Sequence, residues 1–160
     1  MGIQKTNVMR ILDQKKIAYT AHAYEHEEGV AVEGVRVAEI LGQDAARVFK
    51  TLVAQGASRA YYVFVIPAPA SLDLKKAARA VGEKSIAMLP VRDLLSVTGY
   101  VRGGCSPVGM KKQFVTVFHE SAMEYPTIMV SAGKIGAQVE LAPDALIGLV
   151  RGKCADITED

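Results

Sequence analysis

Two segments rich in β-branched and aromatic residues constrain the fold of this chain more than any other feature. They are RVFKTLVAQ (47–55) and AYYVFVIP (60–67), and only GASR (56–59) separates them. Such segments favour strands, and a short connection with glycine favours a hairpin between them. Both faces of the first strand are mostly apolar, which indicates a sheet that is covered on both sides.

Periodicity elsewhere predicts four further strands and five helices. Strands are expected at 17–24, 113–118, 127–132 and 137–141, and helices near 7–16, 35–41, 71–81, 90–98 and 143–150. Several of the helical segments are followed by glycine, the residue preferred just beyond a helix C-terminus. Because strands come in runs rather than in strict alternation with helices, the predicted class is α+β: a mixed, curved sheet with flanking helices.

Composition limits the function classes that this chain suits. It has 160 residues, 50% of them apolar and 22% charged, which predicts a single folded domain over 1–160. The net charge of +2 is too small for a polybasic nucleic-acid binder. No apolar run is long enough to span a membrane, and two cysteines make no disulfide framework. We therefore expect a cytoplasmic protein without membrane contact.

Lys50 is the most unusual single residue, because it lies on a strand whose faces are otherwise apolar. Strand alternation puts Lys50 on one face with Val48 and Leu52, and Thr51 on the other. A buried ammonium is costly unless it is paired or reaches a wet cleft. The alternative is that Lys50 extends from the strand end into solvent.

The stretch GYVRGGCSPVGMKK (99–112) concentrates glycine more than any other part of the chain. Successive N–H groups in a loop of this kind can bind a carbonyl oxygen and stabilise an oxyanion, with SAGKIG (131–136) as a facing wall. Ordinary β-turns explain both segments equally well. Cys105 as a nucleophile with His119 as its base is a weaker hypothesis. His22 and His26 lack the convergent partners that a metal site needs, so no metal or cofactor is expected.

Five segments in order resemble the YbaK/ProX family over roughly residues 5 to 157. They are HAYEH, VFKTLV, LDLKKAARAVG, GYVRGGCSPVGMKK and SAGKIGAQVELAPDAL. This family contains deacylases of Cys-tRNA(Pro) and Cys-tRNA(Cys) and the editing domain of some bacterial prolyl-tRNA synthetases. The resemblance implies a mixed, curved sheet with flanking helices, and hydrolysis of the ester that links a wrong amino acid to tRNA.

The resemblance also implies a set of site residues. It assigns catalysis to Lys50 and to the turn residues Gly103, Gly104 and Ser106. The substrate-binding positions that it implies are Tyr24, Thr51, Cys105, Pro107, Gly109, Ser131, Gly133 and Lys134. Ala132 replaces a glycine of the family pattern, and Gln138 stands where some members carry an aspartate, so this chain offers no carboxylate at that position.

The resemblance makes Cys-tRNA(Pro) the expected substrate, with Cys-tRNA(Cys) as a second one. In cysteine-specific members the substrate's own thiol is thought to attack its ester, so the protein supplies positioning and electrostatics. The alternatives are a deacylase for Ala-tRNA(Pro) or another small aminoacyl ester, a non-catalytic module that binds tRNA or a synthetase, and a Cys105 thiol enzyme. The expected partners are aminoacyl-tRNA and, as a further candidate, prolyl-tRNA synthetase. Five basic residues are candidates for contacting tRNA phosphates: Lys75, Lys76, Arg79, Lys111 and Lys112.

Overall fold

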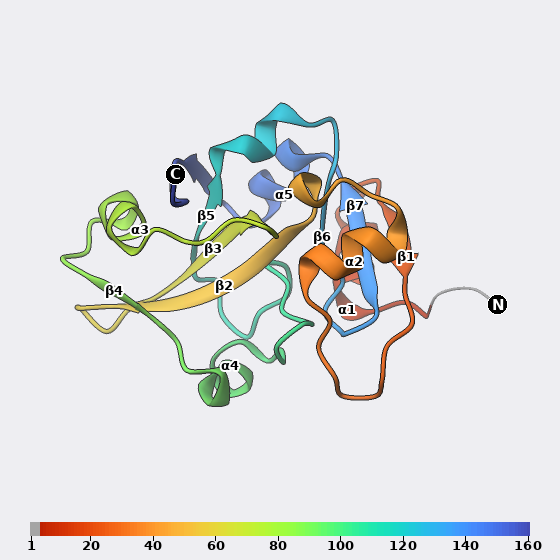
Figure 1. The fold of residues 1–160 in the computed structure, drawn as a ribbon, viewed down its shortest axis with the longest axis horizontal. Helices are drawn as coiled ribbons and strands as arrows, with labels where there is room; N and C mark the ends of the chain where they lie inside the picture. The colour runs from red at the N-terminus through yellow and green to blue at the C-terminus, as the bar shows by residue number, and fades with distance from the viewer. Residues whose placement is uncertain (1–3) are drawn as a thin grey trace.

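The computed structural model describes residues 4–160, and its α+β architecture confirms the expected fold class (Figure 1). The helices are α1 (Asn7–Gln14), α2 (Gly34–Leu41), α3 (Leu74–Val81), α4 (Val91–Thr98) and α5 (Pro143–Leu149), with 3-10 turns η1 (Ala45–Arg47) and η2 (Glu120–Glu124). The strands are β1 (Thr20–Ala23), β2 (Phe49–Gly56), β3 (Tyr61–Pro67), β4 (Ile86–Met88), β5 (Val115–His119), β6 (Ile128–Ser131), β7 (Ala137–Leu141) and β8 (Lys153–Ala155).

The expected hairpin is the centre of a five-stranded sheet in the order β4-β2-β3-β5-β8. Strands β2 and β3 are antiparallel, with Lys50 opposite Ile66, while β5 runs parallel to β3 and to β8. The edge strands β4 and β8 were not predicted. Each has only three residues, too few to display an alternation of apolar and polar side chains.

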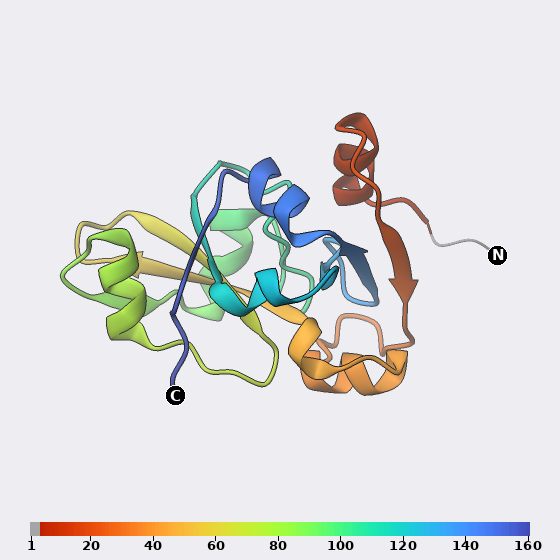
Figure 2. The same ribbon diagram turned by 90° about the horizontal axis from the view of Figure 1, so that it is seen from above.

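The other strands form a separate three-stranded sheet, β1-β7-β6, so the strands divide between two sheets instead of forming one. A single parallel bridge, between Val48 and Met129, connects the start of β2 to β6. Figure 2 shows α1 and α2 on opposite sides of this smaller sheet. Val8, Met9 and Leu12 of α1 are buried in the main core. Ala38 of α2 packs with the bridge residues Val48 and Met129, so α2 covers the sheet face on which these two side chains lie.

Local signals explain where the helices begin and end. The hydroxyl of Thr6 accepts a hydrogen bond from the Met9 N–H, and the Asp73 carboxylate accepts two from the first turn of α3. Gly42, Gly82 and Gly99 end α2, α3 and α4, respectively, in left-handed conformations, which glycine adopts without steric cost. None of the helices within residues 4–160 is long and apolar enough to cross a membrane.

Candidate functional site

Lys50 lies in a cleft of about 690 Å³ at the start of β2. Ligand sites in proteins typically have volumes of roughly 300–1,000 Å³. The cleft is lined by residues from the loop before α2 and its first turn, from β2, from the end of β3 and from the glycine-rich loop: Val30, Ala31, Val32, Glu33, Gly34, Val35, Lys50, Thr51, Leu52, Ala68, Arg102 and Gly103. Of the sequence-predicted site residues, the cleft therefore brings together Lys50, Thr51 and Gly103.

The ammonium of Lys50 is partly desolvated in this cleft. Burial lowers the pKa of Lys50, and the nearby Glu33 carboxylate partly opposes this shift by favouring the charged form. Glu33 and Arg102 line the same cleft, so one anion and a second cation share it with Lys50. Lys50 therefore lines a cleft and is not a residue that simply extends into solvent.

The strand register puts Ser131 close to Lys50. Strands β2 and β6 run parallel at the bridge between Val48 and Met129, and Lys50 and Ser131 each lie two residues beyond it. Because side chains alternate, Lys50 shares the face of Val48, and Ser131 shares the face of Met129. Val48 and Met129 pack in one apolar cluster, so the four side chains belong to one continuous face.

Tyr24 and Gln138 belong to that same face. Gln138 on β7 is the register partner of both Ser131 and His22. The N–H of Tyr24 donates to the Gly136 carbonyl at 2.9 Å, which extends the β1–β7 ladder by one residue. Alternation from His22 then places the Tyr24 side chain on the face of Gln138.

Two buried polar atoms of this face, Tyr24 Oη and Gln138 Oε1, have no hydrogen-bond partner within residues 4–160. The same holds for Thr51 Oγ1, whose residue follows Lys50 on β2 and lines the cleft. Buried polar atoms are almost always paired, because an unpaired one costs about 1–3 kcal/mol. Unpaired atoms of this kind are available to a ligand. Gln138 is a candidate that sequence reasoning had only marked as a departure from the family pattern.

The two glycine turns face each other, as expected from the sequence. A Cβ on Gly104 would lie 3.0 Å from Lys134 Cα and 3.1 Å from the Ile135 nitrogen. A Cβ on Gly103 would lie 2.8 Å from Ala31 Cβ, in the wall of the cleft. These close approaches of backbone to backbone explain why both positions are glycine. The side chain of Lys134 itself is exposed.

The N–H groups of the glycine-rich loop are not all free. The Gly104 N–H donates to the Val101 carbonyl at 2.9 Å, so in this conformation it cannot donate to a ligand. In the part of the chain that the structure describes, the N–H groups of Gly103, Cys105 and Ser106 have no acceptor. The set of donors that the sequence suggested thus loses Gly104 and keeps the other three.

The side chains of Cys105 and Ser106 point into the protein. Ser106 is fully buried, and its Oγ accepts a hydrogen bond from the Val108 N–H at 3.2 Å. Cys105 belongs to the main core, and burial raises the pKa of its thiol to about 12. A thiol with this pKa is protonated at neutral pH, and only the thiolate is a nucleophile.

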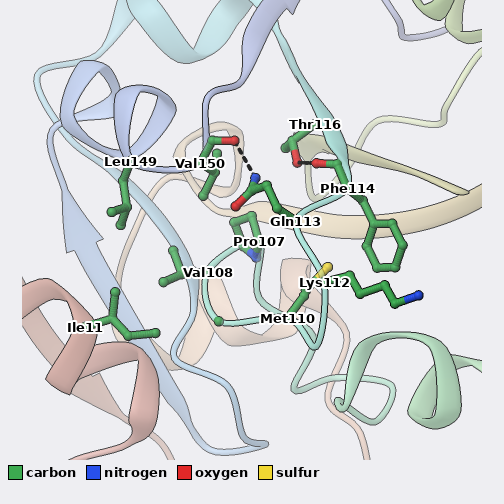
Figure 3. Close-up of a pocket in the computed structure, with 11 residues that line it drawn as sticks. Ile11, Pro107, Val108, Met110, Lys112, Gln113, Phe114, Thr116, Leu149 and Val150 are labelled. Carbon is green, nitrogen blue, oxygen red and sulfur yellow. Dashed lines mark hydrogen bonds between the residues drawn. The ribbon is translucent and has the colours of Figure 1, made fainter.

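Pro107 and Gly109 do not line the Lys50 cleft. They line a smaller pocket of about 220 Å³ between the glycine-rich loop, Ile11 of α1 and Leu149 of α5 (Figure 3). Gly133 also packs elsewhere, because a Cβ there would lie 3.1 Å from Val8 Cγ2 and 3.2 Å from Tyr100 Cε1. These three predicted positions therefore pack within and between the loops and do not line the Lys50 cleft.

Sequence reasoning missed Glu33 and Arg102, which lie in loops where no periodicity marks them. One signal was available: Gly34 is the first residue of α2, where a Cβ would lie 2.7 Å from Ala68 Cβ, so the start of α2 had to approach the end of β3 closely. Among the proposed phosphate contacts, Lys76 is already paired. Its Nζ lies 3.1 Å from Asp156 and 3.0 Å from Asp160.

The ring nitrogens of His22 and His26 have hydrogen-bond partners within the protein. His22 Nε2 lies 2.8 Å from Glu140 Oε1, and His26 Nδ1 lies 2.9 Å from the Glu27 carbonyl oxygen. Over residues 4–160 there is no group of three or more His, Cys, Asp and Glu side chains placed to hold a metal ion.

Comparison with known proteins identifies the class to which this fold and site belong. The model of the aminoacyl-tRNA editing domain matches residues 26–149. A candidate Cys-tRNA(Pro)/Cys-tRNA(Cys) deacylase of Enterococcus faecalis, EbsC, is 49% identical over 97% of this chain and 94% of its own length. YwhH of Bacillus subtilis, an uncharacterised protein, is 27% identical over 69% of this chain and 70% of its own length.

Solved structures show the same fold. A candidate trans-editing enzyme for prolyl-tRNA synthetase matches with a TM-score of 0.81 and 22% identity, over 99% of this chain and 100% of the other. The hypothetical protein APE2540 matches with a TM-score of 0.85 and 20% identity, over 95% of this chain and 99% of the other. The chain belongs to the aminoacyl-tRNA editing domain family, which confirms the resemblance to YbaK/ProX.

Proposed function

We propose that this chain hydrolyses the ester bond of mischarged Cys-tRNA(Pro), and also of Cys-tRNA(Cys). The observation that carries the proposal is the partly buried Lys50 ammonium in a cleft, next to a glycine whose N–H is unpaired, in a chain of the editing family. The name of the Enterococcus relative supports the choice of cysteine, since the two chains are 49% identical.

In the proposed reaction the substrate's thiol is the nucleophile. Its sulfur attacks the ester carbonyl carbon, the bond to the ribose oxygen breaks, and that oxygen takes up the thiol proton. The cyclic thioester that forms is then opened by water to free cysteine. The unpaired N–H groups of Gly103, Cys105 and Ser106 are the donors we assign to the developing oxyanion.

Lys50 has an electrostatic role in this proposal. Its ammonium holds the terminal phosphate or orients the ester, and Tyr24, Thr51, Ser131 and Gln138 position the aminoacyl group. Desolvation strengthens the attraction between Lys50 and an anion, because charges interact more strongly away from water. The exposed Lys134 and Arg102 are the cations at the rim that we assign to tRNA phosphates.

The competing functions make different predictions. The raised pKa and burial of Cys105 argue against a Cys105 thiol enzyme. A deacylase for Ala-tRNA(Pro) would use the same cleft with a bound water as nucleophile. A non-catalytic module that binds tRNA or a synthetase would show no turnover and no effect of Lys50 on any rate.

A deacylation panel tests the proposal. The substrates are tRNA(Pro) charged with cysteine, alanine or proline, and Cys-tRNA(Cys), each with and without prolyl-tRNA synthetase. At neutral pH we expect Cys-tRNA(Pro) to be hydrolysed much faster than Pro-tRNA(Pro). Cleavage of Ala-tRNA(Pro) with Cys-tRNA(Pro) left intact would overturn the substrate assignment, and no turnover of any ester would favour a binding module.

A further inference from the structure

Tyr100 lies between the two glycine turns that flank the site. A Cβ on Gly109 would lie 2.8 Å from Tyr100 Oη, and a Cβ on Gly133 would lie 3.2 Å from Tyr100 Cε1. Both glycines have positive φ values, +80° and +98°, which side chains disfavour. The Tyr100 ring therefore contacts both turns, at positions where a larger residue would push it away.

The Tyr100 hydroxyl binds the middle of the glycine-rich loop. It donates a hydrogen bond to the Val108 carbonyl, and the Val108 N–H donates to Ser106 Oγ at 3.2 Å. Val108 is thus held through both of its backbone polar groups. Ser106, the next residue in this chain of bonds, carries one of the unpaired N–H groups of the loop.

The backbone of Tyr100 is itself anchored to the end of α4. Its N–H donates to Thr98 Oγ1 at 3.0 Å, and that hydroxyl donates to the Leu94 carbonyl at 2.8 Å. The neighbouring Val101 carbonyl accepts from the Gly104 N–H at 2.9 Å. Residues 98–101 therefore fix the loop at both Gly104 and Val108. The free N–H groups of Cys105 and Ser106 lie between these two points, and that of Gly103 directly precedes them.

We propose that Tyr100 is a positioning residue, whose hydroxyl holds residues 103–108 in the conformation that puts Gly103 in the wall of the cleft and leaves the Gly103, Cys105 and Ser106 N–H groups unpaired. This inference rests on the proposed deacylase function. The role needs a hydroxyl that stays protonated, and burial raises the pKa of Tyr100 to about 12. Tyr100 remains a hydrogen-bond donor throughout the pH range of an assay.

Tyr100→Phe tests the proposal, because it keeps the ring between the two turns and removes only the donor. The Val108 carbonyl then loses its partner and the loop loosens. We expect kcat for Cys-tRNA(Pro) to fall about tenfold or more, with KM changed by less than about twofold. A fall in kcat at constant KM indicates an interaction that matters in the transition state. Single-turnover rates are normalised to the folded fraction of each variant, so that a general loss of folded protein does not produce the same result.

Tyr62→Phe is the matched control. The Tyr62 hydroxyl donates to Glu83, Tyr62 is buried, and it packs in a different apolar cluster from the glycine-rich loop. The control removes the same atom and one hydrogen bond, and we expect its kcat to stay at the wild-type value. Equal losses of kcat in both variants would overturn the positioning role.

Amide hydrogen exchange tests the loop without any substrate. The Gly104 and Val108 N–H groups are hydrogen-bonded and report on the loop. In Tyr100→Phe we expect both to exchange about tenfold faster than in Tyr62→Phe. Unchanged exchange overturns the proposal even if no ester is hydrolysed. Faster exchange in Tyr100→Phe, together with a wild-type chain that shows no deacylase activity, would instead overturn the proposed function and leave Tyr100 as the residue that holds the loop.

Discussion

At the scale of single residues, the proposed chemistry depends most on the Lys50 ammonium. We expect Lys50→Ala to lower the deacylation rate by about 100-fold or more, as for loss of one preorganised electrostatic group. Because burial lowers the pKa of Lys50, folding disfavours its charged form, and the alanine variant should keep or slightly exceed the wild-type melting temperature. Single-turnover deacylation and thermal melts measure both effects.

Lys50→Arg is the matched variant for that experiment. It keeps the positive charge but replaces a compact ammonium with a planar guanidinium, so we expect only partial rescue of the rate. A wild-type rate in Lys50→Ala would show that the cleft cation takes no part in the reaction.

Cys105 distinguishes a backbone role from a thiol role. We expect Cys105→Ser to keep the deacylation rate within about tenfold of wild type, because the N–H group stays in place and a thiol of pKa about 12 is not a nucleophile at neutral pH. The buried hydroxyl is expected to lower stability by about 1–3 kcal/mol, so melts accompany the rate measurement. Exposed Cys154 makes Cys154→Ser the control for alkylating reagents.

At the scale of elements, the contact between the two glycine turns fixes the site. Gly104→Ala would place Cβ about 3.0 Å from backbone atoms of Lys134, which cannot move without shifting the turn. Overpacking of this kind typically costs about 1–3 kcal/mol. We therefore expect a lower melting temperature and a lower deacylation rate, measured in the same preparation.

Gly148→Ala is the control for that substitution. A Cβ on Gly148 meets no atom within 4 Å, and Gly148 lies within α5. Alanine is a better helix former by about 1 kcal/mol, so this variant should be more stable and equally active. Wild-type stability and activity in Gly104→Ala would mean that the close approach of the turns does not determine the site.

At the scale of the whole molecule, Glu140 connects the segment before β2 to the three-stranded sheet. Its Oε2 lies 3.0 Å from Arg47 Nη2, and its Oε1 lies 2.8 Å from His22 Nε2. The Glu140 carboxylate on β7 thus contacts η1 through Arg47 and β1 through His22. Arg47 also donates a hydrogen bond to the Thr127 carbonyl. This network is three residues from Lys50 and supports the alignment of the two sheets at the site.

The network makes stability depend on acid pH. A hydrogen bond from the Thr127 hydroxyl, then those from His22 and Arg47, lowers the pKa of Glu140 in the folded state. A lowered carboxyl pKa contributes stability above the unfolded pKa of about 4.3, and this contribution is lost as pH falls through the folded pKa. Urea melts at a series of pH values should therefore show a smaller loss of stability below about pH 4.3 in Glu140→Gln than in wild type. Parallel pH dependence in the two proteins would contradict this role.

Local sequence signals were sufficient to predict the class and most elements. The hairpin of β2 and β3, the Thr6 cap and the glycines after α2, α3 and α4 depend on propensities of neighbouring residues, so a single sequence displays them. The unusual position of Lys50 was likewise visible in the strand alternation. The short edge strands β4 and β8 were missed, because three residues form a strand only when a neighbouring strand offers its backbone.

Tertiary structure alone decided which of the predicted residues share a cleft. Lys50 and Gly103 both line it although 52 residues of the chain lie between them. Pro107 and Gly109, only a few residues beyond Gly103, face a different pocket because the loop turns around Tyr100. The hydrogen bond that occupies the Gly104 N–H was also invisible in the sequence. The physical reason is that propensity acts between neighbours in the chain, whereas a site is made by non-local contacts that exist only after the sheets and loops have packed.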